Sequence, residues 1–382
     1  MIEAQAFVDR LREANYTHYS GVPCSFLKPF INYVINSDDL DYVTAASEGE
    51  AVGISLGAHL AGRKTVTMCQ NSGLGNMVNP LTSLNYPFRI PGILIVTWRG
   101  EPGIPDEPQH VQMGTITHRM LETMDIPWRE FPSEESEIEA AIAEAEASIE
   151  ERQRPFAFIM RKGSVAPHDL NAQASPERLS FDPEILPAGE KGTRTEAIKA
   201  VLDGLHGGEV VVATTGKTGR ELFTVADNPN NLYVVGGMGT ASAIGLGINH
   251  ANPNQKAVVL DGDGAALMKL GVFATIGRYQ PKGLIHIVLD NEQHDSTGGQ
   301  STASAVTDFA KIAAASSYRH VYSVERPEDL KNVVGSLNGD QAGPALIHVK
   351  IKPGSPSDLG RPTVQPHEVK ERFMNFISQS HS

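Results

Sequence analysis

The feature that most constrains the fold of this chain is the regular alternation of short apolar segments with helical stretches. Several apolar segments are hydrophobic throughout, which is typical of strands buried on both faces of a parallel sheet. Strands that alternate with helices predict an α/β architecture. The predicted strands are Thr17–Ser20, Asp41–Ala45, Lys64–Cys69, Ile93–Trp98 and Phe156–Arg161 in the first half, and Glu209–Thr214, Leu232–Val235, Lys256–Leu260, Leu284–Leu289 and Leu346–Ile351 in the second.

A proline-rich stretch separates the two halves of the chain. The length of 382 residues suits two domains. Residues 166–190 show no sustained periodicity and hold Pro167, Pro176, Pro183 and Pro187, a composition typical of an extended linker. We therefore predict one domain over residues 1–165 and a second over residues 191–382, each built on a doubly wound parallel sheet.

The two halves also resemble each other. Each contains a helix rich in small residues (48–59 and 236–247) that is followed by a strand and then by a glycine-rich loop (71–76 and 261–264). This similarity indicates either an internal repeat or the rhythm that any two doubly wound sheets share. Ligands of such sheets bind beyond the carboxyl ends of the strands, where both glycine-rich loops fall.

The charge and composition exclude several classes of protein. With 32 Lys+Arg against 45 Asp+Glu, a formal net charge of −13 argues against nucleic acid or an anionic membrane as a partner. No apolar run reaches the roughly 20 residues that span a bilayer. The first residues include acids where a signal peptide has cations, and they predict an amphipathic helix. Cys24 and Cys69 form neither a disulfide framework nor a metal cluster. We expect a cytoplasmic protein.

The sharpest motif is Gly262-Asp263-Gly264, which Asn291 follows 28 residues after the aspartate. A predicted strand precedes each part of the motif, so Asp263 and Asn291 should lie at one edge of the sheet. A carboxylate and an amide oxygen suit Mg²⁺ that also binds phosphate oxygens. The two glycines allow the backbone to approach a phosphate closely. An aspartate between glycines is by itself more often a turn, but the strand context favours a metal site.

This combination resembles the cofactor-binding signature of the thiamine diphosphate-dependent 2-oxoacid decarboxylases. The resemblance implies that the side chains of Asp263 and Asn291 and the backbone carbonyl of Gln293 bind Mg²⁺. It implies a pyrimidine-type and a diphosphate-type domain of the thiamine diphosphate-binding fold, without the central domain of longer members. The other cofactor contacts that it implies are Ser72, Gly73, Thr215, Gly216, Gly237, Met238, Gly239, Gly262, Gly264 and Ala265.

The family also requires a glutamate in the pyrimidine-type domain. Glu48 follows a predicted strand and opens a helix, and the equivalent carboxylate of the family helps to remove a proton from the cofactor. Glu50 is the alternative, although the spacing to Gly57 favours Glu48. A helix N-terminal acid that interacts with the helix dipole is the simpler interpretation. The resemblance also implies that Met238 supports the bent conformation of the cofactor. Without the resemblance, a methionine in this sequence context is more often part of a hydrophobic core.

Because it lacks a central domain, the chain resembles a short branch of the family. The substrates of this branch are 2-oxoacids with a β-phosphonate, and the nearest rival substrates are 2-oxoacids with a β-sulfonate. The expected reaction releases CO₂ and an aldehyde. A carboligating synthase of the acetolactate type and a catalytically silent thiamine-binding protein are two rival interpretations. The segments that carry this resemblance are Ser20–Pro29, Asn71–Asn76, Trp98–Gly100, Asp106–His110, Thr214–Phe223 and Asn291–Gln300.

The candidates for substrate binding and proton transfer follow from charge and pKa. Arg99, Lys217 and Ser25 could bind the β-acidic group, although each cation can equally be a surface charge. His110 and His294 are suited to proton transfer near neutral pH, or are structural histidines. Cys24 stands where many relatives have aspartate, so a catalytic role and an inert buried thiol both remain open. The resemblance further implies a homodimer or homotetramer with active sites between subunits.

Overall fold

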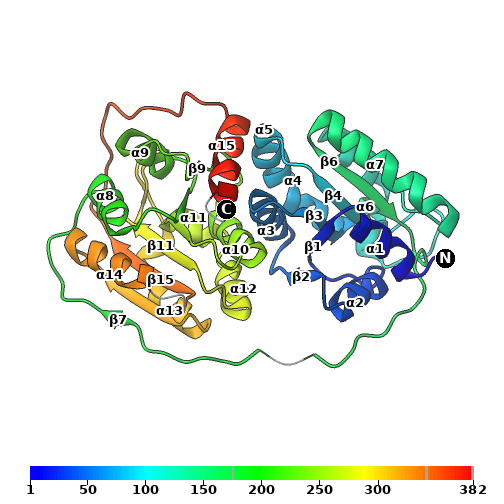
Figure 1. The fold of residues 1–382 in the computed structure, drawn as a ribbon, viewed down its shortest axis with the longest axis horizontal. Coiled ribbons are helices and arrows are strands. Elements are labelled where there is room, and N and C mark those ends of the chain that lie inside the picture. The colour runs from blue at the N-terminus through cyan, green and yellow to red at the C-terminus, as the bar shows by residue number, and fades with distance from the viewer. Residues whose placement is uncertain (174–175, 340–342, 380–382) are drawn as a thin grey trace. The chain divides into compact units, whose positions relative to one another are not determined.

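The computed structural model describes residues 1–173, 176–339 and 343–379. The chain forms two compact units, Met1–Ser175 and Pro176–Ser382, and each consists of a parallel sheet with helices on both faces (Figure 1). The division falls inside the predicted linker. This linker also contains a short strand, β7 (Glu184–Ile185), which pairs in parallel with β14 (His320–Val324) of the second unit. None of the helices in the described segments is long and apolar enough to cross a membrane.

The first unit has a six-stranded sheet in the order β2-β1-β3-β4-β6-β5. Its strands are β1 (Tyr16–Gly21), β2 (Asp41–Thr44), β3 (Lys64–Gln70), β4 (Gly92–Thr97), β5 (Trp128–Glu130) and β6 (Pro155–Met160). Its helices are α1 (Ala4–Glu13), α2 (Lys28–Asn36), α3 (Glu48–Leu60), α4 (Leu74–Pro80), α5 (Tyr86–Phe88), α6 (Val111–Thr123) and α7 (Ile138–Arg152). The short helical turns η1 (Asn71–Gly73) and η3 (Pro108–His110) follow β3 and precede α6.

The second unit has a seven-stranded sheet in the order β7-β14-β15-β11-β10-β8-β9. Its other strands are β8 (Val210–Ala213), β9 (Asn231–Tyr233), β10 (Ala257–Gly262), β11 (Leu284–Asp290) and β15 (Ala345–Lys350), and β12 (Gln293–His294) pairs with β13 (Gln300–Ser301) as an antiparallel hairpin. Its helices are α8 (Arg194–Gly204), α9 (Lys217–Val225), α10 (Ala241–Ala251), α11 (Asp263–Met268), α12 (Gly271–Tyr279), α13 (Phe309–Ala315), α14 (Pro327–Gly339) and α15 (Pro366–Gln379).

The two sheets share one topology, which confirms the internal similarity seen in the sequence. The order β2-β1-β3-β4-β6-β5 of the first unit matches the order β9-β8-β10-β11-β15-β14 of the second, to which β7 is added at the edge. In each sheet the chain leaves its first strand to one side and then crosses to the other. The resulting switch points lie between β1 and β3 and between β8 and β10. Ligands of open α/β sheets bind at such points.

Two hydrophobic cores explain why β6 of the first unit is apolar at every position. Phe158 of β6 packs against Phe7 of α1 on one face, with ring centroids 5.5 Å apart. Its neighbour Ile159 belongs to the core on the other face, together with Val52 of α3 and Leu74 of α4. Successive side chains of a strand point to opposite faces, so a sheet covered on both sides needs a continuous apolar run.

Candidate active site

A pocket of about 320 Å³ lies at the carboxyl ends of the central strands of the second unit. Its walls come from the segments that follow β8, β10 and β11, on both sides of the switch point. The predicted site residues that line it are Thr215, Gly216, Lys217, Met238, Gly262, Asp263, Gly264, Ala265, Asn291, Gln293 and His294. Gly237 and Gly239, which flank Met238, both have positive φ angles. The sequence motifs of this half therefore converge on one cavity.

Asp263 is a buried carboxylate at the start of α11, only 3% exposed. The hydroxyl of Thr302 donates a hydrogen bond to Asp263 Oδ2 and lies 2.9 Å from Ser304 Oγ, which in turn donates to Asp290 Oδ1 at 2.8 Å. Burial raises the pKa of Asp263, and the nearby charge of Asp290 acts in the same direction. A divalent cation at this carboxylate would offset both penalties.

Asp290, the last residue of β11, anchors this network. His348 Nε2 lies 2.7 Å and Lys350 Nζ 2.8 Å from Asp290 Oδ2. Burial opposes ionisation of this carboxyl, but the hydrogen bonds from His348, Lys350 and Ser304 hold its pKa below the usual range. The ionised Asp290 therefore fixes the hydroxyl groups that contact Asp263.

Asn291 follows directly and is 4% exposed. Its Oδ1 accepts a hydrogen bond from the backbone N–H of Gln293 at 3.2 Å, and its Nδ2 donates to Asp295 Oδ2 at 2.6 Å. The pocket thus offers a carboxylate and an amide oxygen, and Gln293, whose backbone carbonyl is the third expected ligand, also lines it. This all-oxygen set fits Mg²⁺, which prefers one or two carboxylates together with phosphate oxygens.

Gly264 is needed for the position of His294. A Cβ atom at residue 264 would lie 2.5 Å from the imidazole carbon Cε1 of His294, closer than real Cβ contacts occur. The sequence predicts Gly262 and Gly264 as sites of close backbone approach to a phosphate. A Cβ at residue 262 would meet no protein atom within 4 Å, so this side of the loop faces open space. Gly264 admits the histidine ring, and Gly262 leaves room for a ligand.

The first unit gathers its predicted site residues at the carboxyl ends of β1 to β4. These residues are Cys24, Ser25, Glu48, Ser72, Gly73, Arg99 and His110. Glu48 is the first residue of α3, after Ser47, whose side chain caps the helix by accepting from the backbone N–H of Glu50 at 3.4 Å. Asn76 Nδ2 donates to Glu48 Oε2 at 2.8 Å. A Cβ at residue 73 would lie 2.3 Å from Glu48 Oε1, so Gly73 leaves the space that the carboxylate occupies.

Arg99 is anchored rather than free. Its Nε donates to Asp106 Oδ2 at 2.8 Å and its Nη2 to Asp106 Oδ1 at 2.5 Å, while its Nη1 donates to Ser25 Oγ at 3.3 Å. Its guanidinium carbon lies 4.8 Å from the centre of the Phe26 ring. Arg99 lowers the pKa of Asp106 through this bidentate hydrogen bond. The pair holds the loop after β4, and an anion would share the charge of Arg99 with Asp106.

The other two candidates of this unit are buried. Cys24 is 8% exposed, and its thiol donates to Gln70 Oε1 at 3.3 Å and lies 3.6 Å from Thr97 Oγ1. Cys24 also belongs to the hydrophobic core on the α1 face of the sheet, so its thiol has both polar and apolar neighbours. His110, the last residue of η3, is 6% exposed, and its Nδ1 has no hydrogen-bond partner among the described residues. A buried imidazole nitrogen without a partner is available to a ligand or a water molecule.

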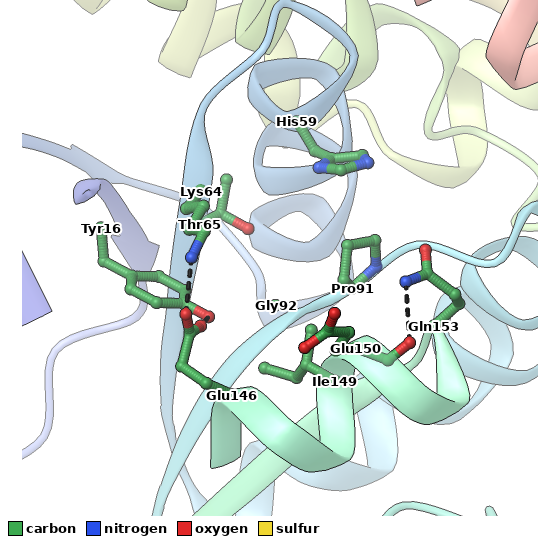
Figure 2. Close-up of a pocket in the computed structure, with 10 residues that line it drawn as sticks. All are labelled: Tyr16, His59, Lys64, Thr65, Pro91, Gly92, Glu146, Ile149, Glu150 and Gln153. Atoms are coloured by element: carbon green, nitrogen blue, oxygen red, sulfur yellow. Dashed lines mark hydrogen bonds and ion pairs between the residues drawn. The ribbon is translucent and has the colours of Figure 1, made fainter. Parts of the chain in front are cut away.

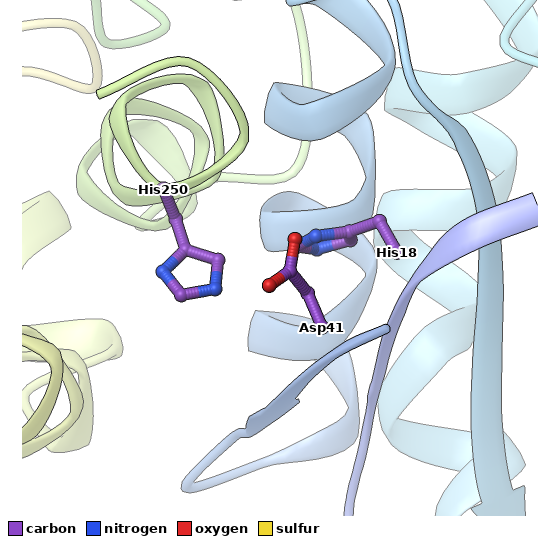
Figure 3. Close-up of side chains that lie close together, drawn as sticks. All are labelled: His18, Asp41 and His250. Atoms are coloured by element: carbon purple, nitrogen blue, oxygen red, sulfur yellow. The ribbon is translucent and has the colours of Figure 1, made fainter. Parts of the chain in front are cut away.

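Two other features drawn in the figures lie away from these residues. A pocket of about 330 Å³ opens at the opposite edge of the first sheet, where β1, β3 and β4 begin (Figure 2). Its polar groups pair with one another, since Glu146 accepts from the Tyr16 hydroxyl at 2.5 Å and from Lys64 Nζ at 2.6 Å. His18 and Asp41 are register partners on β1 and β2, and Figure 3 labels both side chains.

Comparison with known proteins identifies the family. The chain matches two family models, "Thiamine pyrophosphate enzyme, N-terminal TPP binding domain" over residues 1–123 and "Thiamine pyrophosphate enzyme, C-terminal TPP binding domain" over residues 214–349. It is 43% identical over 381 residues to the phosphonopyruvate decarboxylase of Streptomyces viridochromogenes, an alignment that covers 99% of this chain and 96% of that protein. The chain belongs to the thiamine pyrophosphate enzymes.

As a thiamine pyrophosphate enzyme, the protein uses thiamine diphosphate, the same cofactor under another name. The sulfopyruvate decarboxylase of Methanosarcina acetivorans is 31% identical and aligns over 93% of this chain and 92% of that protein. The crystal structure of benzoylformate decarboxylase from Polynucleobacter necessarius superposes with a TM-score of 0.71 at 13% identity, covering 92% of this chain and 99% of that chain. This last similarity supports the two-domain α/β fold alone.

Several buried or partly buried polar residues around the second-unit pocket were not predicted from the sequence. They are Arg194, Glu221, Asp290, Asp295, Thr302, Ser304, His348 and Lys350. One signal was present for two of them: His348 and Asp290 interrupt or end strands that are otherwise apolar, and a buried ionisable group of that kind needs a partner. Arg194 gave no such signal, because it stands at the start of an amphipathic helix, where a surface cation is the ordinary expectation.

Proposed function

We propose that this thiamine pyrophosphate enzyme decarboxylates phosphonopyruvate to phosphonoacetaldehyde and CO₂, with Mg²⁺ as the metal that holds the cofactor. The observation that carries the proposal is the 43% identity to a phosphonopyruvate decarboxylase over 96% of the length of that protein. Sulfopyruvate is the second candidate substrate, because a sulfopyruvate decarboxylase is 31% identical over 92% of its length. Such an activity would belong to phosphonate biosynthesis, including that of phosphonate antibiotics.

The residues of the second unit would bind the cofactor. Mg²⁺ would be coordinated by Asp263, the Asn291 amide and the Gln293 carbonyl, and it would in turn hold the diphosphate. Gly216 lines the same pocket just before α9, where the free backbone N–H groups of the helix start could bind a phosphate. When bound, thiamine diphosphate supplies the electron sink for loss of CO₂. Met238 lines the same cavity and can pack against the cofactor rings through its flexible thioether.

The residues of the first unit would supply the remaining chemistry. Glu48 would share a proton with the cofactor, in a position that the Asn76 hydrogen bond fixes. Ser25 and Arg99, together with Lys217 of the second unit, would bind the phosphonate. His110 or His294 would transfer protons, and Cys24 is a third candidate for that role.

We further propose that the enzyme works as a cytoplasmic homodimer or homotetramer. Each unit carries only part of the proposed chemistry, with the glutamate in one and the metal ligands in the other. In the family that the sequence resembles, these two parts come from different subunits. A size-exclusion experiment coupled to light scattering would show the assembly directly, and a monomer with full activity would contradict this proposal.

The substrate can be tested with three 2-oxoacids side by side. We expect the purified protein with thiamine diphosphate and Mg²⁺ to release CO₂ and aldehyde fastest from phosphonopyruvate. The phosphonate can carry two negative charges, which suits the two cations proposed to bind it, Arg99 and Lys217. Release from sulfopyruvate in preference would move the assignment to the second candidate. Condensation products from pyruvate would indicate a carboligating synthase, and no release from any of the three would contradict the proposed reaction.

Replacement of Gly73 by alanine tests the position of Glu48. The new methyl group would lie 2.3, 2.4 and 2.5 Å from Oε1, Cδ and Cγ of Glu48, so the whole side chain must turn to another rotamer and the carboxylate must leave its position. A misplacement of about 1 Å can cost roughly 100-fold in rate, so we expect a fall in kcat of that order with a nearly unchanged melting temperature.

The matched control is Gly75→Ala, two residues further along. A Cβ at residue 75 meets no atom within 4 Å, and the residue lies within α4. Alanine favours a helix over glycine by up to about 1 kcal/mol, so this variant should be as stable as the parent or more so, and as active. Equal activity of the two variants would contradict the inferred contact between residue 73 and the catalytic carboxylate.

A further inference from the structure

The amide of Asn291 is bonded on both sides by groups of fixed polarity. The backbone N–H of Gln293 can only donate, so the atom that it contacts at 3.2 Å must be the amide oxygen. The carboxylate of Asp295 can only accept, so the atom 2.6 Å from its Oδ2 must be the amide nitrogen. The orientation of this amide is therefore set by its partners, and the oxygen is the amide atom left with a free lone pair.

Asp295 is itself held by a buried arginine. Arg194 Nη2 donates to Asp295 Oδ2 at 2.5 Å, the same oxygen that the Asn291 amide contacts. Arg194 Nη1 donates to Glu221 Oε1 at 2.8 Å, and Thr195 Oγ1 donates to the other oxygen of Glu221 at 2.7 Å. The side chains of Arg194, Glu221 and Asp295 are 7%, 1% and 10% exposed. Such buried charge-assisted contacts fix a side chain far more firmly than a surface ion pair does.

We propose that Asp295, held in place by Arg194, is a positioning residue that turns the amide oxygen of Asn291 toward the metal. This inference rests on the proposed function, since it takes Asn291 as a ligand of Mg²⁺. Without Asp295, only the longer contact from the Gln293 N–H, at 3.2 Å, opposes a half-turn of the amide. That half-turn would present the N–H₂ group, which no cation accepts as a ligand. Arg194 acts through Asp295: its hydrogen bond keeps the Asp295 carboxylate within contact distance of the Asn291 amide.

The first test measures Mg²⁺ binding by titration calorimetry of the full chain at a fixed concentration of thiamine diphosphate. Outer partners of metal ligands typically contribute about 10- to 100-fold to metal affinity, so we expect a loss of this order in Asp295→Ala. Asp295→Asn should recover most of it, because its amide oxygen can still accept from Asn291. The control is Asp308→Ala, which removes a carboxylate that caps α13 outside the pocket and should bind Mg²⁺ as the parent does.

The decisive test changes Asn291 to aspartate. A carboxylate has oxygen on both arms and needs no partner to orient it, and at residue 291 it would lie beside the like charge of Asp295. In the Asn291→Asp background, Asp295→Ala should therefore leave Mg²⁺ binding unchanged or strengthen it. A purely structural role of Asp295 would weaken binding equally in both backgrounds, and this result would overturn the proposal. If Asp295→Ala does not fold, Arg194→Lys replaces it in the test. Lysine keeps the buried positive charge but lacks the two guanidinium nitrogens with which Arg194 contacts both Glu221 and Asp295. Unchanged Mg²⁺ affinity in Arg194→Lys would then overturn the proposal.

The failure of this inference can be told apart from the failure of the proposed function. If the reaction is assigned wrongly, the parent releases no CO₂ from any of the three oxoacids, while the Mg²⁺ affinities of the variants still differ as expected. If the inference is wrong, the parent is active and Asp295→Ala binds Mg²⁺ as tightly as the parent.

Discussion

Replacement of Glu48 by glutamine is expected to abolish most of the decarboxylase activity while the protein remains folded and still binds its cofactor. Proton transfer by a positioned side chain contributes about 10²- to 10⁴-fold to rate, and we expect a loss of kcat in this range. Glutamine keeps the size of the side chain and an oxygen that can accept from Asn76 Nδ2, so the local contacts survive. Steady-state kinetics would give the loss, and calorimetry with thiamine diphosphate and Mg²⁺ would show that binding is retained.

The comparison variant is Glu50→Gln, because Glu50 is the rival that the sequence leaves open. Both glutamates lie in the first turn of α3, but Glu50 is buried at 1% exposure, whereas Glu48 is partly exposed beside Gly73. We expect Glu50→Gln to lower stability more than catalysis. If it loses activity at an unchanged melting temperature and Glu48→Gln does not, the assignment of the catalytic carboxylate is wrong.

Most of the fold could be predicted because several central strands, such as β4, β6 and β10, are apolar along most of their length. All strands predicted from continuous apolar runs are present, since a strand covered on both faces must be apolar throughout. The strands that were missed are β5 and β7 at the sheet edges, β14 next to the edge, and the short β12–β13 hairpin. In β14 only two of five residues are buried. β5 (Trp128–Glu130) contains two charged residues and is partly exposed, and β7 (Glu184–Ile185) is fully exposed. An edge strand buries little, so its sequence carries no hydrophobic signal.

Only those residues of the candidate site that belong to local sequence motifs could be predicted. Asp263 and Asn291 stand after strands that deliver them to one pocket, and the spacing of strands along the chain is visible in the sequence. Arg194, by contrast, lies 101 residues before Asp295, to which it donates. A contact of that kind depends on how helices cover the sheet, and a single sequence gives no periodic signal for it. The contact of Arg194 with Asp295 therefore emerges from the three-dimensional structure alone.

Replacement of Asp263 by asparagine is expected to have the second largest effect, this time on binding of the cofactor. The change removes one buried negative charge but keeps an oxygen that can accept from the Thr302 hydroxyl. Loss of one partner of a buried ion contact costs about 3–5 kcal/mol, which corresponds to roughly 10²- to 4 × 10³-fold weaker binding of Mg²⁺ and of the diphosphate that it holds. Calorimetry and the rise in melting temperature on addition of cofactor would measure this loss.

The melting temperature of the cofactor-free protein separates a ligand role of Asp263 from a structural role. A carboxylate that is 3% exposed destabilises the empty protein, because burial disfavours its charge. Asp263→Asn should therefore melt at the same temperature as the parent or higher when cofactor is absent, and should lose the stabilisation that bound ligand provides. The control Asp227→Asn removes a carboxylate paired with Arg372 away from the pocket and should keep the full response to cofactor. An equal response to cofactor in Asp263→Asn would mean that the metal binds elsewhere, and the whole arrangement inferred around Asn291 and Asp295 would fall with it.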